Sequence, residues 1–137
     1  MMYQTEISLQ SLKYGFNLIS REVEKAIPSL PQQGIINIFL THTSAGLCIN
    51  ENASSDVQSD FRYFLDKLVP ENDKGFNHIE EGPDDMPAHI KSSLLGQSLS
   101  IPIKKGRMAL GTWQGIYLCE FRRHYGRRNI IITVIGE

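Results

Sequence analysis

The chain has 137 residues, of which 41% are hydrophobic and 21% charged, and its formal net charge is -1. This length suits one domain with its own core, and the composition, which shows no low-complexity tract, argues against a disordered protein. The sequence has no long apolar run, which argues against a membrane protein, and its balanced charge leaves nucleic-acid binding to local basic patches. We therefore expect a single domain spanning residues 1–137.

The first ten residues, MMYQTEISLQ, alternate apolar and polar side chains, which predicts a strand over residues 2–9 with one face in water. They lack the succession of basic, apolar and small residues of a signal peptide, so we expect a cytoplasmic protein. The two cysteines, Cys48 and Cys119, form no CxxC pair and lie in apolar stretches. We interpret them as free, buried thiols.

Residues 20–27 have a serine cap, acidic residues in the first turn and helical spacing, and Pro28 ends that helix. The segment GIINIFLTHT, residues 34–43, is apolar at nearly every position, which predicts a central strand buried on both faces. His42 then lies at the C-terminal end of this strand. Residues 47–49 continue as a second short strand after a turn.

A second helix is predicted to begin after Ser54 or Ser55 and to end at Pro70. Its expected buried stripe consists of five apolar residues: Val57, Phe61, Phe64, Leu65 and Leu68. Residues 71–85 contain too many Gly, Pro, Asp and Asn residues for regular structure, and loops of this length are usually functional. Asp84 or Asp85 should then cap a third helix that ends at Gly96.

Four further strands are predicted in the last third of the chain, at residues 98–103, 108–112, 114–121 and 129–135. Their short connections favour an antiparallel meander. The whole pattern predicts an α+β fold: a single-domain β-sandwich with mostly antiparallel strands and two or three flanking helices.

The strand at residues 114–121 separates its side chains into two faces, with Gln114, Ile116, Leu118 and Glu120 on one of them. Glu120 therefore shares a face with apolar residues. A buried carboxylate needs a partner, so Glu120 is either a structural residue in a salt bridge, for which Arg107 is a candidate, or part of a functional site.

Three of the four histidines, His42, His78 and His89, lie between residues 41 and 89. The same segment contains most of the acidic side chains of the chain. Imidazole is a common ligand of divalent transition metals, and a catalytic zinc site uses three protein ligands with one open position. Spacing alone leaves open whether these histidines converge or are unrelated, since no HxH or HxxxH signature is present. Neighbouring hydroxyls and carboxylates, which orient imidazole ligands, favour convergence.

Several other polar residues have both a functional and a structural interpretation. Carboxylates such as Asp84 and Asp85 suit magnesium bound to a substrate phosphate, or simply a solvated loop. Asn50 and Glu51 directly follow a buried strand, where they line a cleft or form a turn. The basic turns around Arg107 and over residues 122–128 suit phosphate binding or a solvated hairpin tip.

Several long motifs of the sequence resemble those of a known family. They are THTSAGLCINEN, HIEEGPDDMPAHIK, SIPI, GRMALGTWQGIYLCEF and the terminal IGE. In this order, over essentially the whole chain, they resemble the YjbQ-like family, uncharacterised protein family 47, whose members are also described as secondary thiamine-phosphate synthases.

The resemblance implies a β-sandwich with flanking helices, a homotrimer, and a pocket in which three histidines bind a metal. On this chain these would be His42, His78 and His89. The resemblance also implies a weak transfer reaction in which a thiazole phosphate displaces pyrophosphate from a pyrimidine. The remaining pocket candidates fall in matching motifs: Ser44, Asn50, Glu51, Asp84, Asp85 and Glu120.

Our leading hypothesis is a metal-dependent enzyme acting on a small phosphorylated substrate, with zinc as the expected ion and magnesium or manganese as alternatives. A carboxylate among Glu51, Asp84, Asp85 and Glu120 would be catalytic, by orienting water or coordinating pyrophosphate. Ser44, Asn50 and Arg107 would bind substrate. The alternative is a non-enzymatic, trimeric ligand-binding or scaffold protein. Nucleic-acid binding through residues 122–128 is the least favoured hypothesis, since only Tyr125 is interleaved with these basic residues.

Overall fold

The computed structural model describes all 137 residues and contains eight strands and three helices. Their bounds in chain order are β1 (Met2–Leu9), β2 (Gly15–Leu18), α1 (Ser20–Lys25), β3 (Gln33–Leu40), β4 (Ala45–Glu51), α2 (Ser55–Leu68), α3 (Asp85–Leu95), β5 (Ser98–Lys104), β6 (Arg107–Met108), β7 (Gln114–Glu120) and β8 (Arg128–Gly136). The predicted mixture of antiparallel strands with three helices is confirmed.

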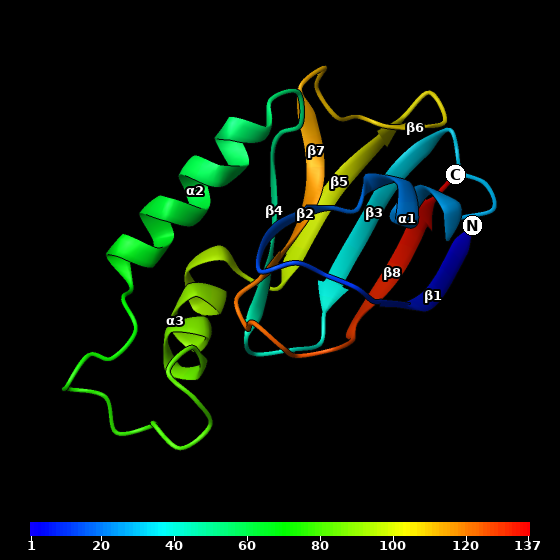
Figure 1. The fold of residues 1–137 in the computed structure, drawn as a ribbon. Coiled ribbons are helices and arrows are strands. Elements are labelled where there is room, and N and C mark those ends of the chain that lie inside the picture. Colours follow the sequence, from blue (N-terminus) through cyan, green and yellow to red (C-terminus); the bar gives the residue numbers. More distant parts are fainter.

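The strands form two antiparallel sheets (Figure 1). The larger sheet has the order β1-β8-β3-β5-β6, and the smaller has the order β2-β7-β4. The last strand, β8, therefore lies between the first strand and β3. The predicted meander is wrong, because β7 leaves its neighbours in the sequence and pairs with β2 and β4. Since β7 carries apolar side chains on both faces, it belongs at the centre of a sheet that is covered on both sides.

One large core cluster contains residues from both sheets. Ile36, Ile38 and Leu40 of β3 contribute to it, as do Ile116 and Leu118 of β7. Burying each such side chain stabilises the fold by about 1.5–3 kcal/mol relative to leaving it in water. The other face of β7 belongs to a second cluster under α3, which consists of Ala88, Tyr117, Cys119 and Phe121. The predicted division of this strand into two apolar faces is confirmed.

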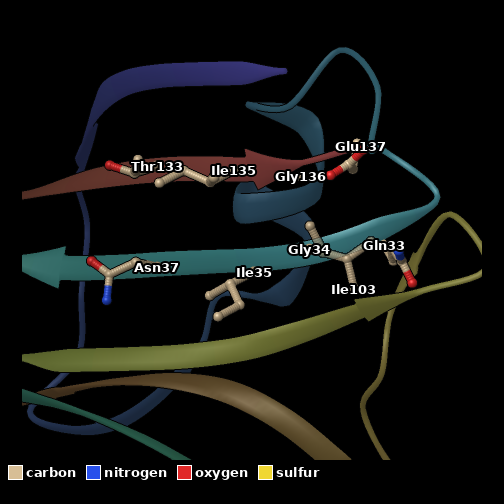
Figure 2. A pocket seen from close by; sticks show the side chains of 9 residues that line it. All are labelled: Gln33, Gly34, Ile35, Asn37, Ile103, Thr133, Ile135, Gly136 and Glu137. Atoms are coloured by element: carbon tan, nitrogen blue, oxygen red, sulfur yellow. The ribbon is translucent and has the colours of Figure 1, made fainter.

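The outer face of the larger sheet is open. Ile35 and Phe39 of β3 are 53% and 44% exposed, so the prediction that this strand is buried on both faces is wrong. The physical reason is that its second apolar face has no covering layer within this chain (Figure 1). A hollow of about 620 Å³ lies on this face, with Ile35, Asn37, Thr133 and Ile135 along it (Figure 2).

Helix α2 projects from the body of the molecule (Figure 1), contacts the smaller sheet through residues such as Phe61 and Gln58, and has no buried residue. The predicted buried stripe is wrong, since Phe64 is 57% and Leu68 is 56% exposed. The irregular segment that follows α2 is confirmed, because no helix or strand lies between Leu68 and Asp85. None of the three helices has the length and apolar character that a bilayer crossing requires.

Candidate metal centre

The start of α3 brings three metal-ligating side chains together. Asp85 and His89 are four residues apart, so they project from the same side of the helix. The preceding loop places His78 against them: its Nε2 lies 2.6 Å from Asp85 Oδ2, while His89 Nε2 lies 3.1 Å from the same oxygen. The ligand atoms of these three residues all lie within 4.8 Å of one another.

A backbone carbonyl fixes the proton on one ring nitrogen of His89. Its Nδ1 lies 2.8 Å from the Thr43 carbonyl oxygen, and a carbonyl can only accept, so Nδ1 carries a proton. In a neutral ring, Nε2 then has a lone pair, which faces the Asp85 carboxylate. Lone pair and carboxylate repel each other, so this geometry requires a positive species between them, either a second proton on His89 or a metal ion.

The donor set fits a divalent transition metal. Two imidazoles and one carboxylate are the three protein ligands of many catalytic zinc sites, with bonds of about 2.0–2.2 Å. A tetrahedral ion with such bonds holds its ligand atoms about 3.3 Å apart. The pair of His89 and Asp85 is close to this spacing, whereas His78 must move outward by a fraction of an ångström. His78 is 45% exposed, so it has the freedom to do so.

Arg122 organises the acidic side of the cluster. Its Nη1 donates to Asp85 Oδ1 at 2.6 Å and its Nε donates to Asp84 Oδ2 at 3.0 Å. Burial opposes ionisation of Asp85, but the hydrogen bond from His78 and the charge of Arg122 outweigh it, so the pKa of this carboxyl lies below its ordinary value. Asp85 is therefore a carboxylate with Oδ1 held by arginine and Oδ2 facing the two imidazoles.

His42 lies outside this cluster. It follows β3, and its Nε2 accepts a hydrogen bond from the Asn129 backbone N–H at 2.9 Å. Burial and the nearby charge of Arg128 hold the pKa of His42 below its ordinary value, although Glu120 opposes them. A neutral His42 agrees with its role as an acceptor. The structure does not bring this histidine together with His78 and His89, and its role as a metal ligand stays a prediction.

Glu120 belongs to a buried ion pair with Arg128. The arginine donates from Nε to Oε2 at 2.7 Å and from Nη2 to Oε1 at 2.5 Å. The suggested pairing of Glu120 with Arg107 is wrong, because Arg128 at the start of β8 fills that place. Ser44 is also buried here, and its carbonyl oxygen accepts from Arg128 Nη2 at 3.2 Å.

Three predicted site residues lie far from the cluster within this chain. Asn50 and Glu51 are at the opposite end of β4 from Ala45, about 20 Å away at the rise of a strand. Arg107 pairs with Lys104, which in turn pairs with Gln33 at the far end of β3. The structure therefore does not place these three beside His89, and their roles stay predictions.

Sequence reasoning missed Arg122 and Arg128. Both belong to the basic loop, residues 122–128. The sequence indicates this loop as a phosphate-binding candidate but does not distinguish between its arginines. One available signal was the buried carboxylate of Glu120, which demanded a cation and is followed within eight residues by four arginines. The choice between these arginines depends on the loop conformation, which the sequence pattern does not contain.

Fold and site together define a small mixed α/β protein with antiparallel sheets and a candidate His-Asp-His metal centre at the start of its third helix. The model of the family described as UPF0047 protein YjbQ-like matches residues 5–137. The chain belongs to this family.

Relatives and solved structures agree with this assignment. The chain is 49% identical to the UPF0047 protein YjbQ of Salmonella typhimurium over 140 residues, which cover 100% of each chain. The UPF0047 protein YugU of Bacillus subtilis is 41% identical over 75% of this chain and 76% of its own. The fold is similar to that of a conserved hypothetical protein, TT1486, from Thermus thermophilus, with a TM-score of 0.85, 31% identity and coverage of 96% and 99%.

Proposed function

We propose that this chain is a divalent-metal-dependent enzyme that acts on a small phosphorylated substrate. The observation that carries the proposal is the geometry of the cluster: the ligand atoms of His78, Asp85 and His89 lie within 4.8 Å of one another, and the bond from His89 Nδ1 to the Thr43 carbonyl turns Nε2 toward the Asp85 carboxylate. Zinc is the expected ion because the donors are two imidazoles and one carboxylate, and manganese or magnesium are alternatives. A bound ion would supply Lewis-acid stabilisation of negative charge on a phosphate oxygen.

The proposed ligand set is His78, Asp85 and His89, which replaces His42 of the sequence-based set by Asp85. Asp84 and Glu120 are then held by arginines at the edge of the site rather than free to act as bases. The reaction that the YjbQ-like resemblance suggests, displacement of pyrophosphate in a weak thiamine-phosphate synthase reaction, needs stabilisation of a diphosphate leaving group. A divalent cation beside arginine side chains supports that chemistry.

Metal uptake by the chelator-treated protein tests the site. We expect one zinc or manganese ion per chain by isothermal titration calorimetry and elemental analysis. His89→Ala and Asp85→Asn should each weaken binding by about tenfold or more, since each removes one of three ligands. His124→Ala removes an exposed histidine of the basic loop and is the matched control. A wild-type protein that takes up no metal, or a His89→Ala variant that binds as tightly, would contradict the proposal.

Turnover separates the enzyme from the alternative, a non-enzymatic ligand-binding or scaffold protein. The assay measures pyrophosphate release from a pyrimidine pyrophosphate in the presence of a thiazole phosphate. The enzyme hypothesis expects release that chelation and His89→Ala abolish and that His124→Ala leaves intact. Metal binding without any metal-dependent turnover of phosphorylated substrates would favour the scaffold hypothesis.

Three further properties belong to this proposal. We infer that the two sheets form the predicted β-sandwich, supported by the one core cluster to which both contribute. A homotrimer is expected from the YjbQ-like resemblance, and exposed apolar side chains on the larger sheet and α2 support an assembly. The cytoplasmic location stays a prediction from the first residues of the sequence.

A further inference from the structure

The guanidinium of Arg128 has a hydrogen-bonding edge that nothing in the chain uses. Arg128 is 0% exposed, and its Nε and Nη2 atoms are bound by Glu120 and by the Ser44 carbonyl. Its Nη1 atom is buried and has no hydrogen-bond partner. Buried charged donors in folded proteins nearly always have a partner because desolvating them is costly. An orphaned donor on a fixed arginine therefore points to a missing acceptor.

Tyr125 covers the Arg128 guanidinium but does not accept a hydrogen bond from its Nη1 atom. The Arg128 Cζ atom lies 3.5 Å from the centre of the Tyr125 ring, so the ring occupies the face of the guanidinium. The N–H bonds of a guanidinium lie in its plane, and a ring on the face leaves them free. Tyr125 is itself 48% exposed and precedes Gly126, whose φ of +114° turns the loop. The cover is thus an exposed side chain on a surface loop.

The backbone joins this arginine to the metal centre. The successive carbonyls of Thr43 and Ser44 accept hydrogen bonds from His89 and from Arg128, respectively. A second link runs through Arg122, whose backbone N–H donates to Glu120 while its side chain donates to Asp85. The two groups are thus linked through shared neighbours, with Thr43 and Ser44 on one side and Arg122 on the other.

The positive charge of the loop beside Arg128 favours an anionic ligand. Glu120 neutralises Arg128, but the adjacent Arg127 is exposed and forms no ion pair, so the loop keeps a positive charge beside the buried edge. Arginine binds phosphate through charge-assisted hydrogen bonds, and a phosphate offers several acceptor oxygens in tetrahedral directions. We propose that Arg128 binds a phosphate group of the substrate through Nη1, with Tyr125 as a cover that moves aside. The choice of phosphate rests on the proposed function.

The test uses the full chain after chelator treatment, so that its outcome does not depend on metal uptake. Inorganic phosphate, pyrophosphate and phenyl phosphate are titrated by calorimetry, and the three arms separate a free phosphate from a diphosphate or an ester. Two-dimensional ¹H–¹⁵N NMR locates the site through the Arg128 Nε–H signal and the amides of residues 126–129. We expect saturable binding of at least one probe, with shifts concentrated at these positions.

Three variants sharpen the result. Glu120→Gln with Arg128→Gln keeps a hydrogen-bonding pair in the buried position while removing both charges, and should weaken binding by about tenfold or more. Tyr125→Ala should tighten binding, since the cover no longer has to move. Arg21→Gln removes an exposed arginine of α1 and should bind as the wild type does.

Absence of binding in the wild type, shifts located away from residues 126–129, or unchanged binding by a folded double variant would each overturn the proposal. Weaker binding by Tyr125→Ala would overturn the role of Tyr125 as a cover. Binding of phosphate by a chain that takes up no metal would retain this site and reject the metal centre, so the two failures are distinguishable.

Discussion

At the start of β8, Arg128 shares a dry environment with Glu120, which is 3% exposed at the end of β7. Bringing these two charges out of water costs about as much as their attraction returns, so the intact pair contributes little net stability. Removing one partner is different, because the remaining charge stays buried without compensation. The pair therefore makes the strand ends sensitive to single substitutions.

Glu120→Ala should lower the free energy of unfolding by about 3–5 kcal/mol, since it strands the Arg128 charge. Glu120→Leu combined with Arg128→Met replaces both charges by apolar groups and should recover most of that loss. Urea unfolding at one fixed protein concentration measures both effects. Glu24→Ala, on the exposed side of α1, is the control and should change stability by less than about 0.5 kcal/mol. A Glu120→Ala protein as stable as this control would show that the pair is not buried in solution.

At the residue scale, the sequence indicated which segment holds the clustered side chains, and the grouping depends on local spacing. The donor-rich segment contained His78, Asp85 and His89, and the last two lie one helical turn apart. Contacts between distant segments were not predictable, because they depend on how strand ends meet. His42 was grouped with the other histidines on composition, whereas the register of β8 places the Asn129 amide against its ring.

Helix α2 is held to the rest of the chain by a few contacts rather than by a buried face. Asp66 accepts hydrogen bonds from Lys91 Nζ at 2.6 Å and from the Tyr14 hydroxyl at 2.5 Å. Phe61 stacks on Phe16 with ring centres 5.3 Å apart. Burial and the hydrogen bond to Asp66 raise the pKa of Tyr14, so its hydroxyl stays a donor over the ordinary pH range.

These contacts make the attachment of α2 pH-dependent. Burial raises the pKa of Asp66, but hydrogen bonds from Lys91 and Tyr14 outweigh it, so the folded pKa lies below the ordinary value. The stabilisation is complete above the unfolded pKa of about 3.9 and is lost as the pH falls through the folded value. Amide exchange in α2, corrected for its intrinsic pH dependence, should therefore accelerate below about pH 4 more than exchange in β8.

Asp66→Asn should already speed amide exchange in α2 at neutral pH and remove the acid-induced change. Asp60→Asn, on the same helix but with an exposed carboxylate outside any ion pair, is the matched control. Equal exchange in the two variants would mean that Asp66 does not hold the helix.

Local sequence patterns predicted most helices and strands, but they did not predict which strands pair with each other. The predicted strand at residues 2–9 and the third helix match β1 and α3 in their bounds. Apolar periodicity also gave the two faces of β7. It predicted too much burial for β3 and α2. Apolar periodicity indicates which side chains avoid water, but it does not show whether the same chain covers them.

At the scale of the whole molecule, the exposed surface is larger than the mass implies. A monomeric globular protein of 15.5 kDa exposes about 7200 Å², whereas this chain exposes 8261 Å². The excess agrees with the projecting α2 and the uncovered sheet face. Apolar side chains are prominent on both, with Ile35 and Ile135 on the sheet and Tyr63 and Phe64 on the helix, and such surfaces mark association sites.

We therefore expect the protein to self-associate, with a homotrimer as the predicted state. Sedimentation equilibrium at micromolar concentration should give about three times the mass of one chain, because association would cover the exposed apolar side chains of the sheet face and of α2. Ile35→Lys combined with Ile135→Lys places two charges on the hollow of the sheet face (Figure 2) and should shift the protein toward single chains. Ile79→Lys, on the loop between α2 and α3, is the matched control because Ile79 is 65% exposed away from that face. A wild-type protein that sediments as one chain would reject self-association, and a double variant that assembles normally would exclude this face from the interface.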